Sequence, residues 1–488
     1  MKNQVQLIAY ADRFGGSLPA LNRLLRDHFR GLFGGIHLLP FFSRIDGADA
    51  GFDPADHLTV DPRVGSWQDV HALAEETEVM ADAIVNHISV ESRQFQDFSL
   101  RGAASAYAAL FLTLDDVFPE GATQGELLSI YRPRPGLPFT PMTLKDGSRR
   151  ILWTTFAPQQ IDIDVTSEPG RDYLDSILRT FAANSVRLVR LDAVGYAVKK
   201  RATDCFMIPE TYAFIAELTA RARQLGLEVL VEVHSHYRRQ IDIAAHVDRV
   251  YDFALPPLVL HALFRRTTVH LKHWIEIRPR NCLTVLDTHD GIGVIDAGPT
   301  GGSAPLPGLL PAAELEHTVE EIHIRSKGES RRASGAGARN LDLYQVNCTF
   351  YDALGRNDRA YLLARAVQFF LPGVPQVYYV GLLAGGNDSA LLDRTGAGRD
   401  INRHYYDAAE VELNLRRPVV QKLLELIRLR NAHPAFGGDF RSHECSATVL
   451  DLEWRTEHQW IRLHADFAAD HWRIDYSTEA GIAHIQDP

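Results

Sequence analysis

Eight short apolar runs, rich in β-branched residues, alternate along the chain with longer segments of helical pattern. Such alternation is typical of parallel strands joined by crossover helices, and eight units suit a closed barrel. An open doubly wound sheet normally carries a glycine-rich fingerprint after its first strand, and this chain has none there, so we predict an α/β fold, a (β/α)8 TIM barrel. Strands are expected at 4–10, 35–39, 79–85, 186–191, 227–233, 250–253, 283–286 and 376–379, and helices at 18–29, 66–76 (with Ser66 as N-cap), 173–183, 211–224 and 417–431.

Two long segments interrupt this rhythm, one after the third predicted strand and one after the seventh. We expect an inserted domain at 86–161 and an inserted loop region at 291–355, because loops this long in a compact domain are usually functional or disordered. Both follow the carboxyl ends of strands, where a barrel builds its active site. The catalytic barrel would then comprise 1–85, 162–290 and 356–434, and an alternating pattern beyond it predicts a small C-terminal β domain at 435–488.

Charge and composition argue against two kinds of partner. The chain has 51 lysines and arginines against 62 aspartates and glutamates, a net charge of −11, which disfavours nucleic-acid binding but leaves a small anionic substrate open. Its most apolar stretch, 361–384, contains Arg365 and two prolines, so we expect no membrane span. The N-terminus has no signal-peptide pattern, and four scattered cysteines suit buried free thiols, so we predict a cytoplasmic protein.

Three acidic residues stand at or just after the ends of predicted strands. Asp192 ends the fourth strand, Glu232 lies at the end of the fifth, and Asp290 follows the seventh. A parallel barrel brings such ends to one face. One carboxylate at a strand end is weak evidence, but three together favour glycosidic bond cleavage, in which one attacks the anomeric carbon and a protonated one donates to the leaving oxygen. The third would stabilise the developing positive charge.

The chain resembles the alpha-amylase family of glycoside hydrolases at that family's four signature stretches: DAIVNH at 82–87, VRLD at 189–192, Glu232 in its strand, and DTHD at 287–290. The resemblance implies Asp192 as nucleophile, Glu232 as general acid/base and Asp290 as transition-state stabiliser. Arg190 lies two residues from Asp192, on the same strand face, and would keep that carboxylate ionised. Lys-His often follows the nucleophile motif in amylases, whereas this chain has Gly195-Tyr196, which fits a short substrate better than a long α-glucan.

A narrower resemblance, to the bacterial sucrose phosphorylases within that family, rests on seven stretches: GFDPADH at 51–57, YRPRPGLPFT at 131–140, FAPQQIDI at 156–163, LDAVGY at 191–196, VYDFALPP at 250–257, NLDLYQVN at 340–347 and GRDINRHYY at 398–406. It implies that sucrose and inorganic phosphate give α-glucose 1-phosphate and D-fructose through a β-glucosyl-enzyme, with transglucosylation as a side activity. It implies no organic cofactor. Amylases often carry calcium near the first insertion, but no compact acidic loop of that type is present here, so we expect no essential metal.

The same resemblance implies which residues bind substrate. Arg134, in the first insertion, suits a phosphate or a fructosyl hydroxyl, and Leu343, Tyr344 and Gln345 look like the family's acceptor loop. Asp53, His87, Asp290 and Arg399 would hold the glucosyl ring, with His289 also bonding its hydroxyls and Phe52 and Phe156 on the apolar sugar faces. Arg190 is a further predicted substrate-binding residue. The remaining predicted site residues are Gln160, Tyr196, His234 and Asp342, of which Tyr196 and His234 would reach the fructose.

The sequence leaves several alternatives open. A few substitutions in the acceptor loop would suffice to favour sucrose 6′-phosphate, glucosylglycerol or glucosylglycerate over sucrose, or water over phosphate. A catalytically inactive glycan-binding relative of the fold is disfavoured, because all three carboxylates are present. The oligomeric state, including a homodimer, is not determined by the sequence.

Overall fold

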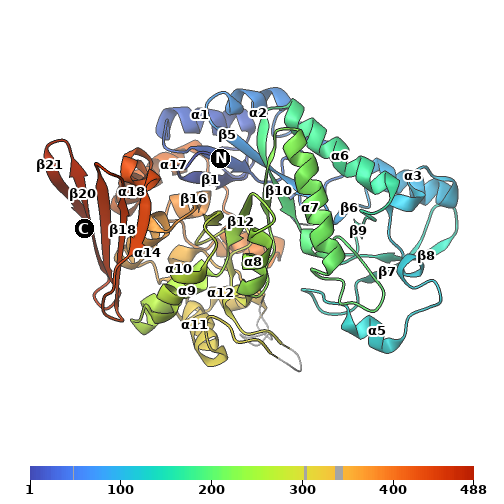
Figure 1. Cartoon of the computed structure of the whole chain (residues 1–488). Coiled ribbons are helices and arrows are strands. Elements are labelled where there is room, and N and C mark those ends of the chain that lie inside the picture. The colour runs from blue at the N-terminus through green and yellow to red at the C-terminus, as the bar shows by residue number, and fades with distance from the viewer. Residues whose placement is uncertain (48, 302–304, 336–343, 488) are drawn as a thin grey trace.

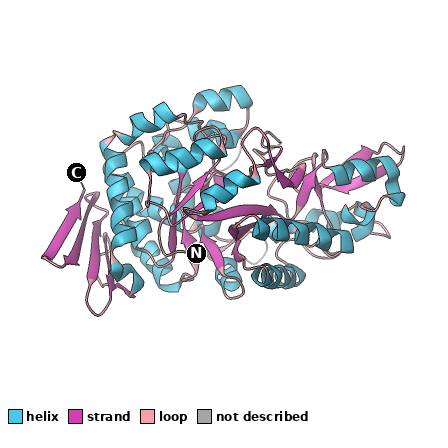
Figure 2. Cartoon of the chain, turned by 90° about the horizontal axis from the view of Figure 1, so that it is seen from above, coloured by secondary structure: helices cyan, strands magenta, loops and turns pink. Residues whose placement is uncertain are grey.

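A closed barrel of eight parallel strands forms the centre of the computed structural model, which describes residues 1–47, 49–301, 305–335 and 344–487 (Figures 1 and 2). Around the barrel the strands follow the order β1-β16-β13-β12-β11-β10-β5-β2. Their bounds are β1 Gln6–Ala9, β2 Gly35–Leu38, β5 Glu78–Ile84, β10 Val186–Asp192, β11 Glu228–Val231, β12 Arg249–Asp252, β13 Cys282–Thr284 and β16 Val374–Tyr378. The barrel prediction is confirmed, and each of the eight predicted runs overlaps one barrel strand.

Helices cover the outside of the barrel (Figure 2). They include α1 Leu18–His28, α2 Trp67–Ala74, α6 Glu168–Ala183, α7 Pro209–Gln224, α8 Tyr237–Ala244, α9 Leu255–Arg265, α10 Val269–Ile277, α14 Asp358–Phe370 and α18 Pro418–Ala432. Ser66 is the N-cap of α2, as predicted, and its backbone N–H donates to Asp69. Helix α6 begins earlier than predicted, because Ser167 accepts a hydrogen bond from the Gly170 N–H and a proline in the first turn fits the helical φ.

The chain between β5 and β10 forms a lobe at one side of the barrel, on the right of Figure 1. It contains β6 His87–Ser89, α3 Arg93–Arg101, α4 Leu114–Val117, α5 Gln124–Ser129, the antiparallel pair β7 Phe139–Thr143 and β8 Arg149–Trp153, and β9 Gln160–Asp162. The lobe has a small apolar cluster of its own around Trp153 and Phe118. Strand β6 pairs with β9, and this pairing returns the end of the lobe to the mouth of the barrel beside His87.

The chain between β13 and β16 also returns to the barrel mouth. It contains β14 Ile292–Gly293, the 3-10 turn η4 Ile295–Ala297, α11 Ala312–Arg325, α12 Glu329–Ser334, β15 Gln345–Val346 and α13 Phe350–Ala353. In the antiparallel pair β14–β15, Gly293 lies opposite Gln345. A residue from the far end of this long segment is therefore held close to the chain that follows β13.

A five-stranded antiparallel sheet closes the chain, on the left of Figure 1, and confirms the predicted C-terminal β domain. Its strands are β17 Asp439–Ser442, β18 Val449–Arg455, β19 Trp460–Asp466, β20 His471–Thr478 and β21 Gly481–Gln486. The sheet packs on α14, and the Trp454 indole N–H donates to the Phe370 carbonyl at 2.7 Å. Among the described residues, every helix is too short or too polar to span a membrane.

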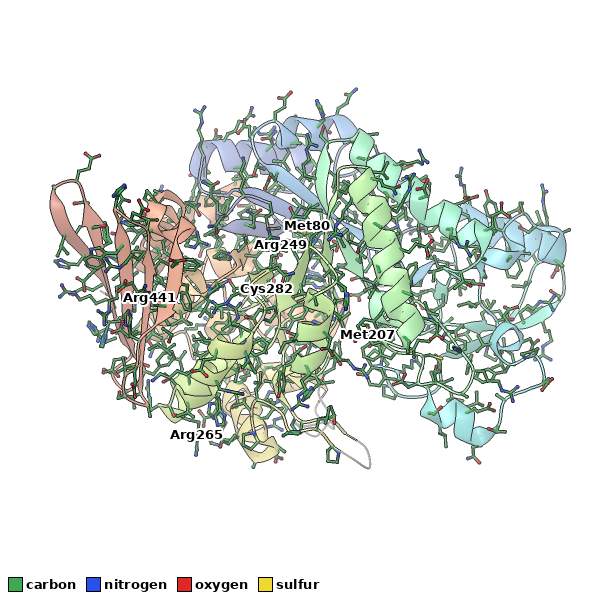
Figure 3. The ribbon with its side chains drawn as sticks, viewed as in Figure 1. Met80, Met207, Arg249, Arg265, Cys282 and Arg441 are labelled. Carbon is green, nitrogen blue, oxygen red and sulfur yellow. The ribbon has the colours of Figure 1, made fainter. Side chains whose placement is uncertain are left out.

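The four cysteines are free thiols. Three are buried as predicted, among them Cys282, which Figure 3 places at the barrel. Cys445 differs, because it lies half-buried in the turn that precedes β18.

Candidate active site

Three carboxylates meet around one buried arginine at the carboxyl ends of the barrel strands. The Arg190 guanidinium lies 2.7 Å from Asp192 Oδ1, 3.9 Å from Glu232 Oε1 and 2.6 Å from Asp82 Oδ1. The side chain of Arg190 is only 2% exposed, so these charges interact with little screening by water. Ligand atoms of Glu232, His234 and Asp290 also lie within 4.8 Å of one another. The structure thus brings together Asp192, Glu232 and Asp290, the three acidic residues that the sequence singles out.

Two opposing influences act on the charge of Asp192. Burial raises the pKa of Asp192 well above its usual range, Arg190 lowers it, and the carboxylates of Glu232, Asp82 and Asp290 raise it further. Arg190 therefore acts in the predicted direction, but burial outweighs it in the free site. Asp82 differs, because His37 at 2.9 Å and Arg190 outweigh burial and lower the pKa of Asp82 to about 2.

Asp290 lies among arginines from the chain after β16. Arg399, in the 3-10 turn η6 Gly398–Asn402, lies 2.9 Å from Asp290 Oδ1, and Arg403 lies 3.8 Å from it. Burial opposes ionisation, but Arg399 and the other nearby cations lower the pKa of Asp290 far below its ordinary value. Asp290 is therefore a permanent negative charge at this side of the site.

Asp49 is a site residue that sequence reasoning missed. Arg399 donates to Asp49 Oδ2 at 2.8 Å, and Arg403 donates to Asp49 Oδ1 at 3.3 Å. The motif GFDPADH singled out Asp53 instead, which is 5% exposed and accepts the Asp49 backbone N–H at 3.4 Å. Arg399 thus pairs with Asp49 as well as with Asp290, and the substrate-binding role of Asp53 stays a prediction. The one sequence signal that could have pointed to Asp49 is its position in the same loop as Asp53, four residues before it.

The predicted histidines and phenylalanines form a packed wall. The Phe52 ring stacks on His289 with centroids 4.7 Å apart, and the Phe52 carbonyl lies 2.9 Å from His87 Nε2. Phe52 is only 5% exposed and packs against protein, whereas Phe156 is half-buried with its ring 5.2 Å from that of Tyr196. Burial lowers the pKa of both histidines, that of His289 to about 3. Both rings are neutral near pH 7 and can exchange hydrogen bonds with hydroxyls.

Gln160 begins β9, opposite Ser89 of β6, and is 3% exposed. Asp342 and Leu343 lie outside the described residues.

His234 connects Glu232 to the second long segment of the chain. Its Nε2 lies 3.6 Å from Glu232 Oε1 and accepts a hydrogen bond from Gln345 Nε2 at 3.1 Å. The Gln345 amide oxygen in turn accepts from Arg399 at 3.3 Å. Tyr344 places its ring edge-on to His234, with centroids 5.1 Å apart. The predicted acceptor residues Tyr344 and Gln345 therefore do reach the site.

Asp296 is the second residue that the sequence did not reveal. Its carboxylate lies 3.0 Å from His234 Nδ1 and accepts from the Ser235 backbone and from Gln240. Burial lowers the pKa of His234, but the charges of Asp296, Glu232 and Asp290 outweigh it and raise that pKa above its ordinary value. The contact fixes the Nδ1 proton toward Asp296, so Nε2 faces Glu232 and Gln345.

Comparisons with known proteins identify the family of this chain. The model of the alpha amylase catalytic domain matches residues 31–245. The chain is 59% identical to a sucrose phosphorylase of Agrobacterium vitis, with 96% of each chain covered. It is 54% identical to a sucrose phosphorylase of Bifidobacterium adolescentis, covering 94% of this chain and 91% of the relative. The chain belongs to the alpha-amylase family, within its sucrose phosphorylase group.

The similarity to this group extends to the whole fold. The crystal structure of sucrose 6F-phosphate phosphorylase from Thermoanaerobacter thermosaccharolyticum superposes with a TM-score of 0.93 at 38% identity. That alignment covers 100% of this chain and 98% of the other. Both segments that interrupt the barrel, and the C-terminal sheet, therefore belong to the architecture that the two enzymes share.

A lysine occupies the junction between barrel and lobe in this member of the alpha-amylase family. Lys199 Nζ lies 2.6 Å from Asp162 Oδ2 and donates to Asn86 Oδ1 at 2.6 Å. It also donates to the Tyr196 carbonyl. These oxygens are of the kind that would ligate a hard cation, and here they surround an ammonium group. The side chains of Lys199 and Asp162 are 1% and 0% exposed.

We expect Lys199→Met to lower the free energy of unfolding by about 3–5 kcal/mol, because it leaves a buried carboxylate without its counter-ion. Denaturant unfolding would measure the loss. Lys200→Met is the matched control, since Lys200 pairs with Glu210 at the exposed surface. Equal stability of the two variants would show that the buried pair contributes nothing.

Proposed function

We propose that this enzyme transfers the glucosyl group of sucrose to inorganic phosphate and releases fructose and α-glucose 1-phosphate with retained configuration. The identities of 59% and 54% to sucrose phosphorylases, over almost the full chain, support sucrose as the donor. The arrangement of carboxylates supports a double displacement. Transglucosylation of other acceptors would be a side reaction of the same intermediate.

In the first step, Asp192 attacks the anomeric carbon and the bond to fructose breaks. Glu232 gives its proton to the departing fructosyl oxygen, and a β-glucosyl ester of Asp192 forms. This step needs an ionised Asp192 and a protonated Glu232. Burial raises the pKa of Asp192 in the free site, but Arg190 lies 2.7 Å from Asp192 and 3.9 Å from Glu232, so a single negative charge shared by these two carboxyl groups belongs on Asp192 and the proton on Glu232.

The developing oxocarbenium charge would be stabilised by Asp290, whose low pKa keeps it ionised. Asp49, held between Arg399 and Arg403, would accept hydrogen bonds from glucosyl hydroxyls. His87 and His289, both neutral, and the exposed part of Phe156 would complete this subsite.

In the second step, a phosphate oxygen attacks the glucosyl carbon, the ester bond to Asp192 breaks, and Glu232 takes back a proton from the attacking phosphate. One observation carries the choice of phosphate over water: two basic side chains, Arg399 and His234, both contact Gln345 of the predicted acceptor loop. Burial lowers the pKa of Arg134, and the nearby Arg399 lowers it further. Like charges repel each other, and an anion bound near both guanidinium groups would relieve that repulsion. His234 adds a third group: burial lowers its pKa, the charges of Asp296, Glu232 and Asp290 outweigh burial and raise it, and protonation of Nε2 would break the hydrogen bond from Gln345.

The decisive assay incubates the enzyme with sucrose, with and without phosphate, and measures glucose 1-phosphate, glucose and fructose. We expect glucose 1-phosphate to match fructose when phosphate is present. Free glucose formed at the same rate whether or not phosphate is added would replace the phosphorylase proposal with a hydrolase.

Sucrose 6′-phosphate is the second candidate donor, because the superposed crystal structure is of a sucrose 6F-phosphate phosphorylase. Testing both donors, together with glucosylglycerol and glucosylglycerate, separates the alternatives by their kcat/KM values. The higher identity to sucrose phosphorylases favours sucrose. A cytoplasmic location, an absence of nucleic-acid binding and a homodimer stay predictions.

For Arg134→Ala, we expect a larger loss of rate with phosphate as acceptor than with water. The reason is that a phosphate carries negative charge that the guanidinium can bind, whereas water does not. Burst and steady-state kinetics of phosphorolysis and of hydrolysis in the absence of phosphate would give the two ratios. An equal loss in both would remove Arg134 from the acceptor site.

For Asp296→Asn, we expect the alkaline limb of phosphorolysis to move to lower pH. Asp296 raises the pKa of His234, so its loss makes the ring neutral at a lower pH and removes a cation that faces the acceptor. The pH dependence of kcat/KM for phosphate measures the shift. Gln240→Met is the control, because it removes a hydrogen bond to Asp296 but no charge. An unchanged profile in Asp296→Asn would contradict the role given to His234.

A further inference from the structure

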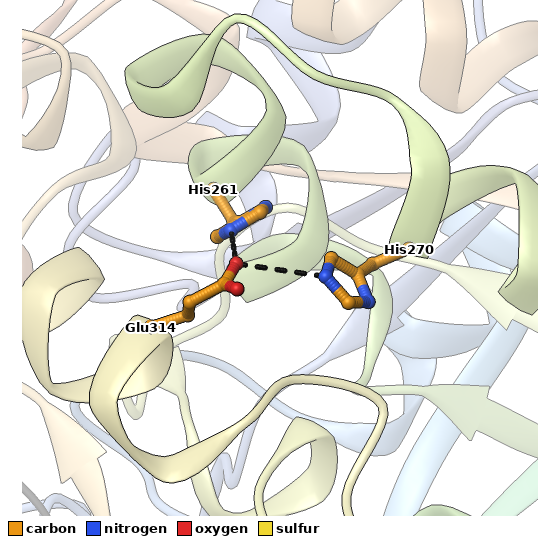
Figure 4. Close-up of side chains that lie close together, drawn as sticks. All are labelled: His261, His270 and Glu314. Atoms are coloured by element: carbon orange, nitrogen blue, oxygen red, sulfur yellow. Dashed lines mark hydrogen bonds and ion pairs between the residues drawn. The ribbon is translucent and has the colours of Figure 1, made fainter. Parts of the chain in front are cut away.

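Two histidines and a glutamate converge outside the barrel, where three helices meet. His261 lies on α9, His270 on α10 and Glu314 on α11. Nε2 of His261 is 2.5 Å from Glu314 Oε2, and Nε2 of His270 is 3.5 Å from the same oxygen. The three ligand atoms lie within 4.8 Å of one another. Figure 4 shows both rings turned toward the carboxylate.

Two imidazoles and one carboxylate are a donor set that holds Zn²⁺ in proteins, with water in the remaining position. Ligand atoms around zinc lie about 2.0–2.2 Å from the ion, so the Glu314 carboxylate would turn back slightly from His261 as the ion enters. Imidazole ligands also suit Ni²⁺ and Co²⁺. Mg²⁺ and Ca²⁺ prefer all-oxygen sites and fit this set poorly.

The surroundings match what such an ion needs. The His261 side chain is only 1% exposed, so packing fixes one ligand in place before an ion enters. A neutral imidazole is the form that binds metal. Helix α9, which carries His261, ends at Arg265, which is labelled in Figure 3. The side chains of His270 and Glu314 are 28% and 36% exposed, so an ion can enter from solvent and keep a water ligand.

We propose that His261, His270 and Glu314 bind one divalent transition-metal ion, with Zn²⁺ the best match, and that this ion fastens α11 to α9 and α10. Helix α11 packs on α12 and α13 in the segment that leads to Tyr344 and Gln345. Helix α9 packs on β14 and on η4, which carries Asp296. The ion would therefore stabilise the attachment of this segment to the barrel and would take no part in the reaction.

The test uses the full-length enzyme, freed of metal with a chelator and titrated with zinc chloride. We expect one equivalent to bind by calorimetry and by metal analysis, and Tm to rise with zinc concentration, because an ion that binds only the folded state stabilises it. His270→Ala and Glu314→Gln should each weaken binding by more than about tenfold and abolish the Tm shift. Both side chains are partly exposed, so the variants should fold. His273→Ala, on the exposed side of α10, is the matched control and should bind zinc normally.

Sucrose turnover locates the ion independently. Glu232, His234 and Asp290 are a second set of candidate ligands, and zinc bound among them would block the substrate pocket. We expect one equivalent of zinc to leave sucrose turnover unchanged. The proposal is overturned if zinc does not bind stoichiometrically, if both variants bind it as the wild type does, or if bound zinc inhibits turnover and does so equally in His270→Ala.

Discussion

Replacing Asp192 by asparagine should reduce sucrose turnover by about 10⁴-fold or more, the scale on which the loss of a nucleophile acts. An amide does not form the glucosyl ester on which both displacement steps depend. Fructose release with saturating sucrose and phosphate, corrected for contaminating wild-type enzyme, measures the loss. Asp172→Asn, the same change on the exposed side of α6, should leave turnover unchanged.

The same variant should be at least as stable as the wild type at neutral pH. Because burial raises the pKa of Asp192 in the folded state, its ionised form costs stability above the pKa of the unfolded chain, and a neutral amide removes that cost. Thermal unfolding at pH 7 measures this. Retained turnover would contradict the nucleophile assignment, and a variant that loses activity only because it unfolds would contradict the electrostatic account of the site.

The barrel and its three carboxylates were predictable because they follow from periodic patterns. A buried parallel strand is a continuous apolar run, so Asp192 and Glu232 stand out where such runs end. The order of units then places these ends on one face without any knowledge of the loops.

Asp49 and Asp296 were not predictable in the same way. Asp49 lies in a loop near the mouth of the barrel, and Asp296 lies in a 3-10 turn, where neither period two nor period 3.6 applies. Their roles depend on partners that arrive from distant parts of the chain. Arg399 reaches Asp49 from the turn after β16, and His234 reaches Asp296 from the end of β11.

The arginines of the site also explain how an acidic protein can use phosphate. Arg399 and Arg403 pair with Asp49 and Asp290, so two of the negative charges that would repel the anion are already compensated. Arg190 compensates part of the negative charge of Asp82 and Asp192 in the same way. The net charge of −11 is therefore a property of the whole surface and does not describe the pocket.

Replacing Glu232 by glutamine should lower kcat/KM for sucrose by about 10²–10⁴-fold, the usual contribution of a general acid. The effect should depend on the leaving group. Fructose departs as an alcohol and needs a proton, whereas fluoride leaves α-glucosyl fluoride without one, so the variant should lose far less activity on the fluoride. Asp192→Asn should lose activity on sucrose and on α-glucosyl fluoride alike, because the reaction of either substrate passes through the glucosyl ester.

The ratio of wild-type to variant kcat/KM, measured for sucrose and for α-glucosyl fluoride with phosphate as acceptor, decides the assignment. The glutamine keeps the shape of Glu232, and its amide can still lie beside the Ala193 backbone N–H and His234. A similar loss on both substrates would mean that Glu232 acts in binding or in shaping the pocket. A loss confined to sucrose would identify proton transfer to the fructosyl oxygen as the step that Glu232 serves, and would leave Asp192, held by Arg190, as the group that takes the glucosyl unit.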